Sequence, residues 1–187
     1  LESFFNKNYF CYMTGFIAGM APDLDILMRD PDDTLYFLEF HRQFSHSLIF
    51  IPIGSIIVAC LIYGIFKRLL GVGFLKIWFF SGLGFATHGA LDAATSYGTL
   101  LLWPFNYDRY SFSIISIVDP FFSLPVITLV VAGVILKNGW WGRVALIWSA
   151  AYLLIGAWQH QSALRIAEAL AESRGHQITR LTVKPTF

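Results

Sequence analysis

The chain alternates between long apolar runs and short polar stretches. Four runs are almost entirely apolar and cover residues 48–66, 74–91, 114–136 and 140–158. Each is close to the ~20 apolar residues that a helix needs to cross a bilayer. A fifth apolar segment, residues 9–21, is shorter and ends at "APDLD". The pattern predicts an all-α, polytopic membrane helix bundle with about four full transmembrane spans and a short N-terminal apolar segment.

The character of the sequence changes after Trp158. The stretch "SALRIAEALAESRGH" has the pattern of an amphipathic helix that ends at Gly175. The following "QITRLTVKPTF" has a strand-like alternation before Pro185. We therefore predict a transmembrane domain over residues 1–158 and the start of an extramembrane portion over 159–187. The first residues, "LESFF", lack an initiator methionine, so we expect the natural N-terminus to lie upstream.

The composition agrees with a membrane protein. Charged residues make up 13% of the chain, about half of the ~25% that is usual in soluble domains. The mean hydropathy is +0.61. The net charge of +1 comes without a basic stripe, which excludes a dedicated nucleic-acid binder. Cys11 and Cys60 lie in apolar segments, so we predict buried thiols rather than a disulfide or a cysteine zinc site.

Positive charges predict the orientation of the bundle. Lys67, Arg68 and Lys76 lie between the first two spans, and Lys137 and Arg143 lie between the last two. The positive-inside rule places both turns in the cytoplasm. Polar residues at the other ends of the spans then share the non-cytoplasmic face: His41, His46, His88, Asp92, Asp108, Arg109, Asp119 and His160. We therefore expect a multi-pass protein of the plasma membrane whose polar cluster lies on the non-cytoplasmic face.

Two short motifs contain pairs of metal-capable side chains. In "HGALD", His88 and Asp92 are one helical turn apart. They could share a metal ion, Asp92 could orient His88 as its hydrogen-bond partner, or the pair could simply tie helices together. In "APDLDIL", Asp23 and Asp25 could both reach a cation on an extended backbone, or could cap a helix or turn. Ionisable groups are costly in a membrane, which favours a functional role.

A third motif, "HRQFSHS", precedes the first full span. His41 and His46 offer imidazoles, which are common zinc ligands. Arg42 could hold an anionic oxygen of a substrate, and the alternative is contact with lipid headgroups. Further along, Asp119 precedes Pro120. That pair is a good helix start, so Asp119 is either an N-cap or a member of the metal site.

Other chemistries lack their motifs. The sequence contains neither a GxSxG nucleophile elbow nor a phosphate-binding GxxxxGK[ST] loop. Several His and Asp residues without cysteine suit a divalent ion, zinc first and manganese second. Such an ion activates water near neutral pH and polarises a phosphoryl or carbonyl oxygen.

Four stretches together carry a family resemblance: "GMAPDLDIL", "FHRQFSHSLIF", "THGALDAATSYGTLLLWPF" and "SIVDPFF". Over roughly residues 10 to 160 the chain resembles the YdjM-like, or YbcI-like, family of bacterial inner-membrane proteins. That family is grouped distantly with the zinc-dependent phospholipase C and single-strand nuclease superfamily. The resemblance implies a helical scaffold whose His and Asp residues bind metal and hydrolyse phosphoesters. The implied ligands are Asp23, Asp25, His41, His46, His88, Asp92 and, less directly, Asp119.

One motif of that family is missing. Its members begin with a Thr-His pair in an N-terminal helix, and no histidine precedes Phe10 here. The number of metal ions therefore stays open.

The leading hypothesis is a membrane-embedded metal-dependent hydrolase. Its substrate would be a phosphoester in a lipid-like or membrane-proximal molecule, attacked by metal-activated water. Arg42 would steady the anionic substrate, and Asp25 would relay the proton. Its partners would be membrane lipid and that lipid-like substrate, with no nucleic acid. The alternatives are a metal-binding transporter or scaffold without hydrolysis, and a bundle whose polar residues only satisfy one another.

Overall fold

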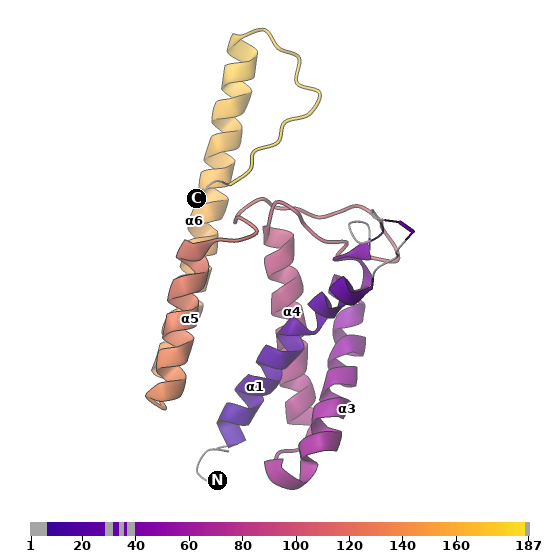
Figure 1. Cartoon of the computed structure of the whole chain (residues 1–187). Coiled ribbons are helices and arrows are strands. Elements are labelled where there is room, and N and C mark those ends of the chain that lie inside the picture. The colour runs from indigo at the N-terminus through magenta and orange to yellow at the C-terminus, as the bar shows by residue number, and fades with distance from the viewer. Residues whose placement is uncertain (1–6, 29–31, 34–35, 37–39, 186–187) are drawn as a thin grey trace. The chain divides into compact units, whose positions relative to one another are not determined.

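A computed structural model describes residues 7–28, 32–33, 36 and 40–185. Within these residues the chain is helical, and its only β pairing consists of two isolated bridges, Thr95 with Ile115 and Thr99 with Tyr110. The all-α prediction is therefore confirmed. The helices, drawn in Figure 1, are α1 (Lys7–Met20), the 3₁₀ helices η1 (Pro22–Leu27) and η2 (Phe44–His46), α3 (Phe50–Leu70), α4 (Phe74–Ala94), α5 (Pro120–Ile135) and α6 (Trp140–Ser173).

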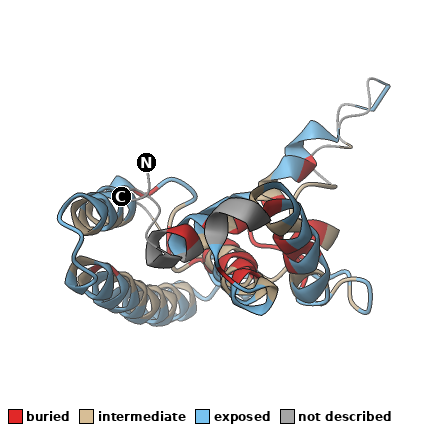
Figure 2. Cartoon of the chain, turned by 90° about the horizontal axis from the view of Figure 1, so that it is seen from below, coloured by how far each residue is buried: buried red, intermediate tan, exposed pale blue. Residues whose placement is uncertain are grey.

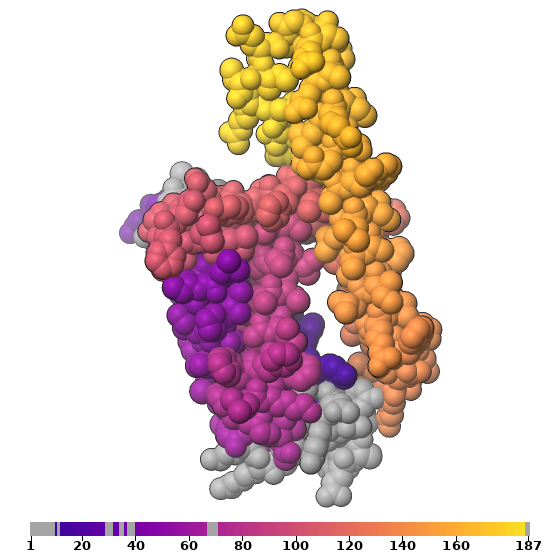
Figure 3. Space-filling model, turned by 180° about the vertical axis from the view of Figure 1, so that it is seen from behind, coloured from indigo at the N-terminus to yellow at the C-terminus, as the bar shows by residue number. Residues whose placement is uncertain are grey.

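The chain forms two compact units. The first comprises residues 1–93 and 98–111, and the second comprises 94–97 and 112–187. The helix α6 continues without a break from Trp140 to Ser173 and so runs through the predicted boundary at 158/159. Gly175 then adopts a left-handed φ of 69° and ends this helix region, as predicted. Residues 176–185 form no strand, and Figure 3 shows them folded back along α6.

The first unit is built from α1, α3 and α4, which lie side by side in Figure 1. Its apolar core contains Phe10 from α1, Ala59 and Ile62 from α3, and Ile77 from α4. The Nε1–H of Trp78 donates a hydrogen bond to Ser55 Oγ at 3.0 Å and links α4 to α3. These core residues lie near the start of α1, in the middle of α3 and near the start of α4. The ends of the three helices away from this core are therefore free to carry polar groups.

Glycines allow α1 and α4 to approach at backbone distance. A Cβ atom on Gly84 would overlap the carbonyl oxygen of Gly15 and would lie 2.8 Å from the amide nitrogen of Gly19. Gly15 and Gly19 form the GxxxG pattern of α1, a spacing that suits close helix packing in membranes. Four residues beyond this crossing, α1 leads to Asp23 and α4 carries His88. The crossing therefore sets the distance between these two side chains.

The second unit pairs α5 with α6. Among the described residues α5 has no buried side chain, and α6 buries only Ala145. Figure 2 accordingly shows these two helices in the colours of exposed and intermediate residues, whereas buried residues gather among α1, α3 and α4. Apolar side chains such as Leu124 (63% exposed) and Leu154 (71% exposed) point outward. An apolar exterior of this kind is suited to lipid.

The predicted spans are helical, but only one has the dimensions of a bilayer-spanning helix. Among the described residues α6 alone is long and apolar enough to cross a membrane. The apolar parts of α3 and α5, Phe50–Phe66 and Pro120–Ile135, are shorter. The third predicted span is reduced because residues 114–119 are not helical. Four full spans are thus not confirmed. Cys60, which we predicted to be buried, is exposed on α3.

Candidate metal centre

Three segments of the first unit supply the polar cluster. The helix η1 follows α1 directly and carries Asp23 and Asp25. Residues 41–47, which include η2, carry the His41 and His46 side chains before α3 begins. The last turns of α4 carry His88 and Asp92. The segment with His46 packs closely on α4, since a Cβ on Gly89 would lie 3.2 Å from the His46 carbonyl oxygen.

Four of the predicted residues form one compact group. Each of Asp23, His46, His88 and Asp92 offers a ligand atom, and these atoms all lie within 4.8 Å of one another. His46 Nε2 lies 3.0 Å from His88 Nε2 and 3.0 Å from Asp92 Oδ2. Asp23 Oδ1 lies 3.4 Å from both Nε2 atoms, and His88 Nε2 lies 3.3 Å from Asp92 Oδ2. This cluster of Asp and His side chains could bind a metal ion.

Five of the six separations between these ligand atoms are close to those of a tetrahedral site. Ligand atoms placed ~2.0–2.1 Å from a zinc ion at tetrahedral corners lie ~3.3–3.4 Å from one another. The five separations given above range from 3.0 to 3.4 Å. Imidazole nitrogens and carboxylate oxygens are both among the ligand types that zinc takes. The residues present therefore fit a divalent ion.

The cluster is closed on one side and open on the other. The His46 side chain is completely buried, whereas the Asp23 side chain is 47% exposed. His88 and Asp92 lie between these extremes, at 18% and 11% exposed. Solvent therefore reaches the cluster from the Asp23 side. The cluster thus has one edge, at Asp23, that is accessible to solvent.

Asp25 lies behind His46 rather than in the four-residue group. Its Oδ2 accepts hydrogen bonds from Ser45 Oγ at 2.7 Å and from the Arg42 backbone N–H at 3.1 Å. Its Oδ1 lies 2.7 Å from His41 Nδ1, and His46 Nδ1 lies 3.5 Å from its Oδ2. Ser45 Oγ lies 2.8 Å from His46 Nδ1 and so links Asp25 to the ring. A hydrogen bond on the far nitrogen of a metal-binding histidine fixes the ring's tautomer and orientation. Asp25 and His41, both predicted as ligands, thus lie in a layer that supports His46.

Charge and burial oppose each other in this layer. Burial raises the pKa of Asp25, but hydrogen bonds from His46, Ser45, His41 and the Arg42 amide lower it, to about 2. Burial likewise lowers the pKa of His46, whereas the carboxylates of Asp23, Asp25 and Asp92 raise it to about 10. The cluster is therefore strongly attractive to positive charge, which suits a cation.

Arg42 connects the two layers. Its Nη2 lies 3.3 Å from Asp92 Oδ1 while its backbone N–H donates to Asp25. The residue has a φ of 62°, a conformation that is uncommon for a side chain other than glycine. Its carbonyl oxygen accepts hydrogen bonds from Leu100 N–H at 3.1 Å and Thr99 Oγ at 3.0 Å. The loop that follows α4 thus holds Arg42 in this strained conformation, as is frequent at functional sites.

Asp119 lies in the second unit and acts as a helix cap. Its Oδ1 accepts a hydrogen bond from Phe122 N–H at 3.1 Å at the start of α5, and its Oδ2 accepts one from the Tyr152 hydroxyl at 2.9 Å. The residue is not part of the four-residue metal group. Of the two roles predicted for Asp119, the contacts in the structure match the N-cap.

Replacing Asp119 by alanine should therefore lower stability without changing metal content. The loss of an N-cap costs about 1 kcal/mol. The hydroxyl of Tyr152, on α6, also loses its hydrogen-bond acceptor. Thermal unfolding and elemental analysis of the purified variant would measure both effects. Asp119→Asn, which keeps a capping oxygen, serves as the control and should stay close to the parent protein. A metal deficit in Asp119→Ala with an intact fold would contradict the assignment.

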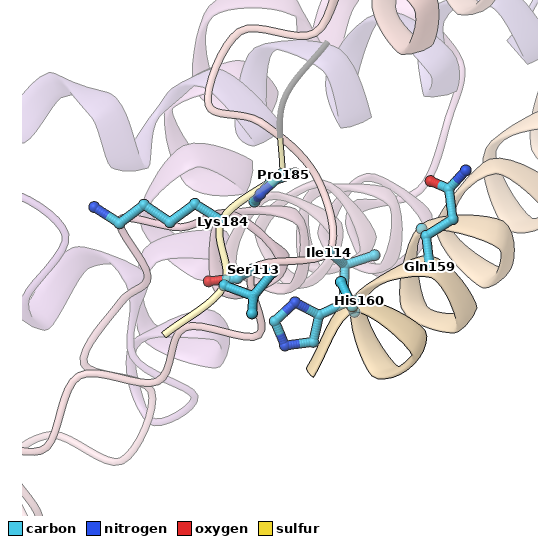
Figure 4. Close-up of a pocket in the computed structure, with 9 residues that line it drawn as sticks. Ser113, Ile114, Gln159, His160, Lys184 and Pro185 are labelled. Atoms are coloured by element: carbon cyan, nitrogen blue, oxygen red, sulfur yellow. The ribbon is translucent and has the colours of Figure 1, made fainter. Parts of the chain in front are cut away.

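The second unit contains a cavity of about 180 Å³ beside His160. Ser113, Gly156, Ala163 and Val183 contribute to its walls. Figure 4 shows the His160 ring next to Ser113, while the Gln159 and Lys184 side chains point away from it. No second ligand-type side chain is therefore gathered at His160 among the described residues.

Sequence reasoning missed the supporting groups. Ser45 was not among the predicted site residues, yet its hydroxyl donates a hydrogen bond to Asp25. Thr99 lies within the stretch "THGALDAATSYGTLLLWPF" but was not singled out, yet its hydroxyl donates a hydrogen bond to the Arg42 carbonyl oxygen. Arg109 donates to the backbone carbonyls of Gly98 and His41 at 3.3 and 3.4 Å. Only the spacing of several polar residues around one predicted site could have signalled such roles.

Comparison with known proteins identifies the family of the chain. The sequence profile of the YdjM inner membrane protein family matches residues 3–163, which include every residue of the metal centre. The chain belongs to this family. The resemblance seen in the four sequence motifs is thereby confirmed, and the family's name places the protein in the inner membrane.

Two curated relatives are similar to this chain over part of their length. One is the inner membrane protein YbcI of Escherichia coli (strain K12), 31% identical over 98 residues, which are 51% of this chain and 54% of the relative. The other is the uncharacterized protein YfhP of Bacillus subtilis (strain 168), 28% identical over 110 residues, 58% of this chain and 32% of the relative. The chain thus spans between a third and about half of these relatives. No solved structure matches.

Proposed function

We propose that this YdjM family member is a membrane-embedded metal-dependent hydrolase that cleaves a phosphoester in a lipid-like or membrane-proximal substrate. The observation that carries the proposal is the group of four ligand atoms with one open side. A purely structural polar cluster has no need of an exposed carboxylate at its edge. A metal that must receive a substrate does need one accessible side.

Zinc is the first choice for the ion, with manganese second. Two imidazoles and two carboxylates at tetrahedral spacing favour zinc, and the absence of cysteine leaves manganese acceptable. When bound, such an ion lowers the pKa of water and polarises a phosphoryl oxygen. Asp23, His46, His88 and Asp92 would hold it.

The remaining charged groups support the ligands. Asp25 is sealed from solvent, with 1% of its side chain exposed, and its pKa of about 2 makes it a weak base. We therefore assign it to orienting His46 rather than to the proton relay first expected. Arg42 is 12% exposed and lies against Asp92. It would keep that ligand in place and add positive charge behind the anionic substrate.

The orientation proposed for the protein follows from its lysines and arginines. Lys76 near the start of α4 and Lys137 after α5 lie at the ends of their helices that are remote in sequence from the metal ligands. The positive-inside rule assigns those ends to the cytoplasm. We accordingly propose a multi-pass protein whose metal centre opens on the non-cytoplasmic face of the inner membrane.

A metal-reconstitution assay tests the hydrolase. The full chain would be purified in detergent, stripped of metal, and reloaded with zinc or manganese. It would then be assayed on bis(p-nitrophenyl) phosphate and on vesicles of phosphatidylglycerol. We expect hydrolysis that depends on the metal and that falls by roughly a hundredfold or more in His88→Ala, since the ion supplies several kcal/mol of transition-state stabilisation.

The alternatives give different results in the same assay. Stoichiometric metal without any hydrolysis would overturn the hydrolase and favour a metal-binding transporter or scaffold. Failure to take up any metal would leave only the structural reading of the cluster. Equal hydrolysis in the parent protein and His88→Ala would point to a contaminating enzyme.

A further inference from the structure

The helix η1 presents three chemically different faces. A 3₁₀ helix has three residues per turn, so residues i and i+3 share a face. Pro22 and Asp25 form the buried face. Asp23 takes its place on a second face, toward the metal cluster. Leu24 and Leu27 form the third face, and they are 61% and 75% exposed. We call this pair the η1 leucine face.

The surroundings of the η1 leucine face are apolar as well. Met20, just before η1, is 55% exposed, and Met28, just after it, is 46% exposed. The only charged residues between positions 20 and 28 are Asp23 and Asp25, and both are occupied by site histidines. Of these two carboxylates only Asp23 is exposed, at the edge of the metal cluster, and the η1 leucine face itself is apolar.

We propose that the η1 leucine face inserts into the lipid surface and thereby places the metal centre at the level of the lipid phosphates. Asp23, the exposed edge of the centre, directly precedes Leu24 in the chain. Insertion of Leu24 and Leu27 into the acyl region would hold Asp23 at the boundary where headgroups begin. Resting on the proposed hydrolase, this inference identifies the substrate as the headgroup phosphoester of a membrane lipid.

A lipid surface fits this face better than a protein partner does. A stable protein interface buries about 800 Å² on each partner, far more than two leucines and two flanking methionines on a six-residue helix can provide. Lipid chains need no complementary shape, and they accept single aliphatic side chains. The chain also belongs to an inner-membrane family, so a lipid surface is available next to η1.

Depth-dependent quenching tests the insertion directly. The full chain, with Cys11 and Cys60 changed to serine, would carry a single Leu24→Cys or Leu27→Cys substitution labelled with an environment-sensitive dye. Asp108→Cys, at an exposed polar position of the same unit, is the matched control. The variants would be reconstituted into vesicles of phosphatidylethanolamine and phosphatidylglycerol. We expect lipids brominated on the acyl chain to quench the dyes at positions 24 and 27 but not at position 108.

Other quenching patterns would overturn the proposal. Quenching of positions 24 and 27 by aqueous iodide alone would mean that the leucines face water. Energy transfer between labelled copies that rises with protein density, without lipid quenching, would mean that a second copy covers the face. These readings need no enzymatic activity, so they stay informative even if the hydrolase proposal fails.

A double variant tests the link to the substrate. Leu24→Ser with Leu27→Ser should keep the parent's metal content and its rate on bis(p-nitrophenyl) phosphate, because neither side chain belongs to the metal cluster. Its rate on phosphatidylglycerol vesicles should fall at least tenfold. Leu75→Ser, which alters an equally exposed leucine on α4 (73% exposed), should change neither rate. An equal rate on vesicles for the double variant and the parent would contradict the substrate assignment.

Discussion

Replacing His46 by alanine is expected to reduce bound metal from about one equivalent to an undetectable level. His46 Nε2 is close to all three other ligand atoms of the cluster, and its side chain is completely buried. Its loss removes a donor and leaves the carboxylates of Asp23 and Asp92 facing each other with less positive charge between them. Elemental analysis of the detergent-purified variant measures the effect.

Two companion variants separate a ligand from its support. His160→Ala removes a histidine of the second unit and should retain the full metal content. Asp25→Asn keeps the shape of the residue behind His46 but weakens its hold on the ring, and such a change typically lowers metal affinity by about 10–100-fold. Competition with a chelator would resolve this intermediate affinity. Complete metal loss in Asp25→Asn with an intact helical spectrum would instead make Asp25 a ligand in its own right.

Replacing Gly84 by alanine is expected to force α1 and α4 apart. The new Cβ would overlap the Gly15 carbonyl and approach the Gly19 amide nitrogen to 2.8 Å, so a backbone must move. Overpacking of this kind costs about 1–3 kcal/mol, and the better helix propensity of alanine returns up to about 1 kcal/mol. Because Asp23 and His88 lie four residues beyond the crossing, the metal affinity should fall together with the melting temperature.

Gly82 provides the matched control on the same helix. A Cβ there would lie 3.9 Å from Ser55 Oγ, an ordinary contact, so Gly82→Ala should keep both the melting temperature and the metal affinity. Thermal unfolding with and without zinc compares the two variants. Unchanged metal affinity in Gly84→Ala would show that the crossing does not set the distance between the metal ligands.

The sequence indicated the residues of the four-residue cluster better than the layer behind them. His88 and Asp92 are recognisable because helical spacing places them on one face, and they do meet. Asp23 and Asp25 alternate in the same motif, but 3₁₀ geometry sends one to the cluster and the other behind His46. Whether these six residues are extended or helical decides where the two carboxylates lie. The pattern of apolar residues does not distinguish the two backbone conformations.

The membrane topology was less predictable for a similar reason. Apolar runs located each helix, yet an apolar run does not say where helical structure starts. Asp119 capping α5 excludes residues 114–118 from the third predicted span. Asp119 itself could be either cap or ligand on sequence grounds, because both roles use the same carboxylate oxygens. Only the contacts with Phe122 and Tyr152 separate the two.

The position of the supporting layer in the chain has a consequence for how the protein assembles. Asp25 contacts His41, Arg42 and Ser45, which follow it by 16, 17 and 20 residues. His88 joins His46 from 42 residues further along. Since synthesis proceeds from the N-terminus, the contacts of Asp25 that orient His46 can form before α4 has been synthesised. The emerging protein would then have Asp23, Asp25 and His46 in place first. The metal site would be complete only when α4 brings His88 and Asp92 to them.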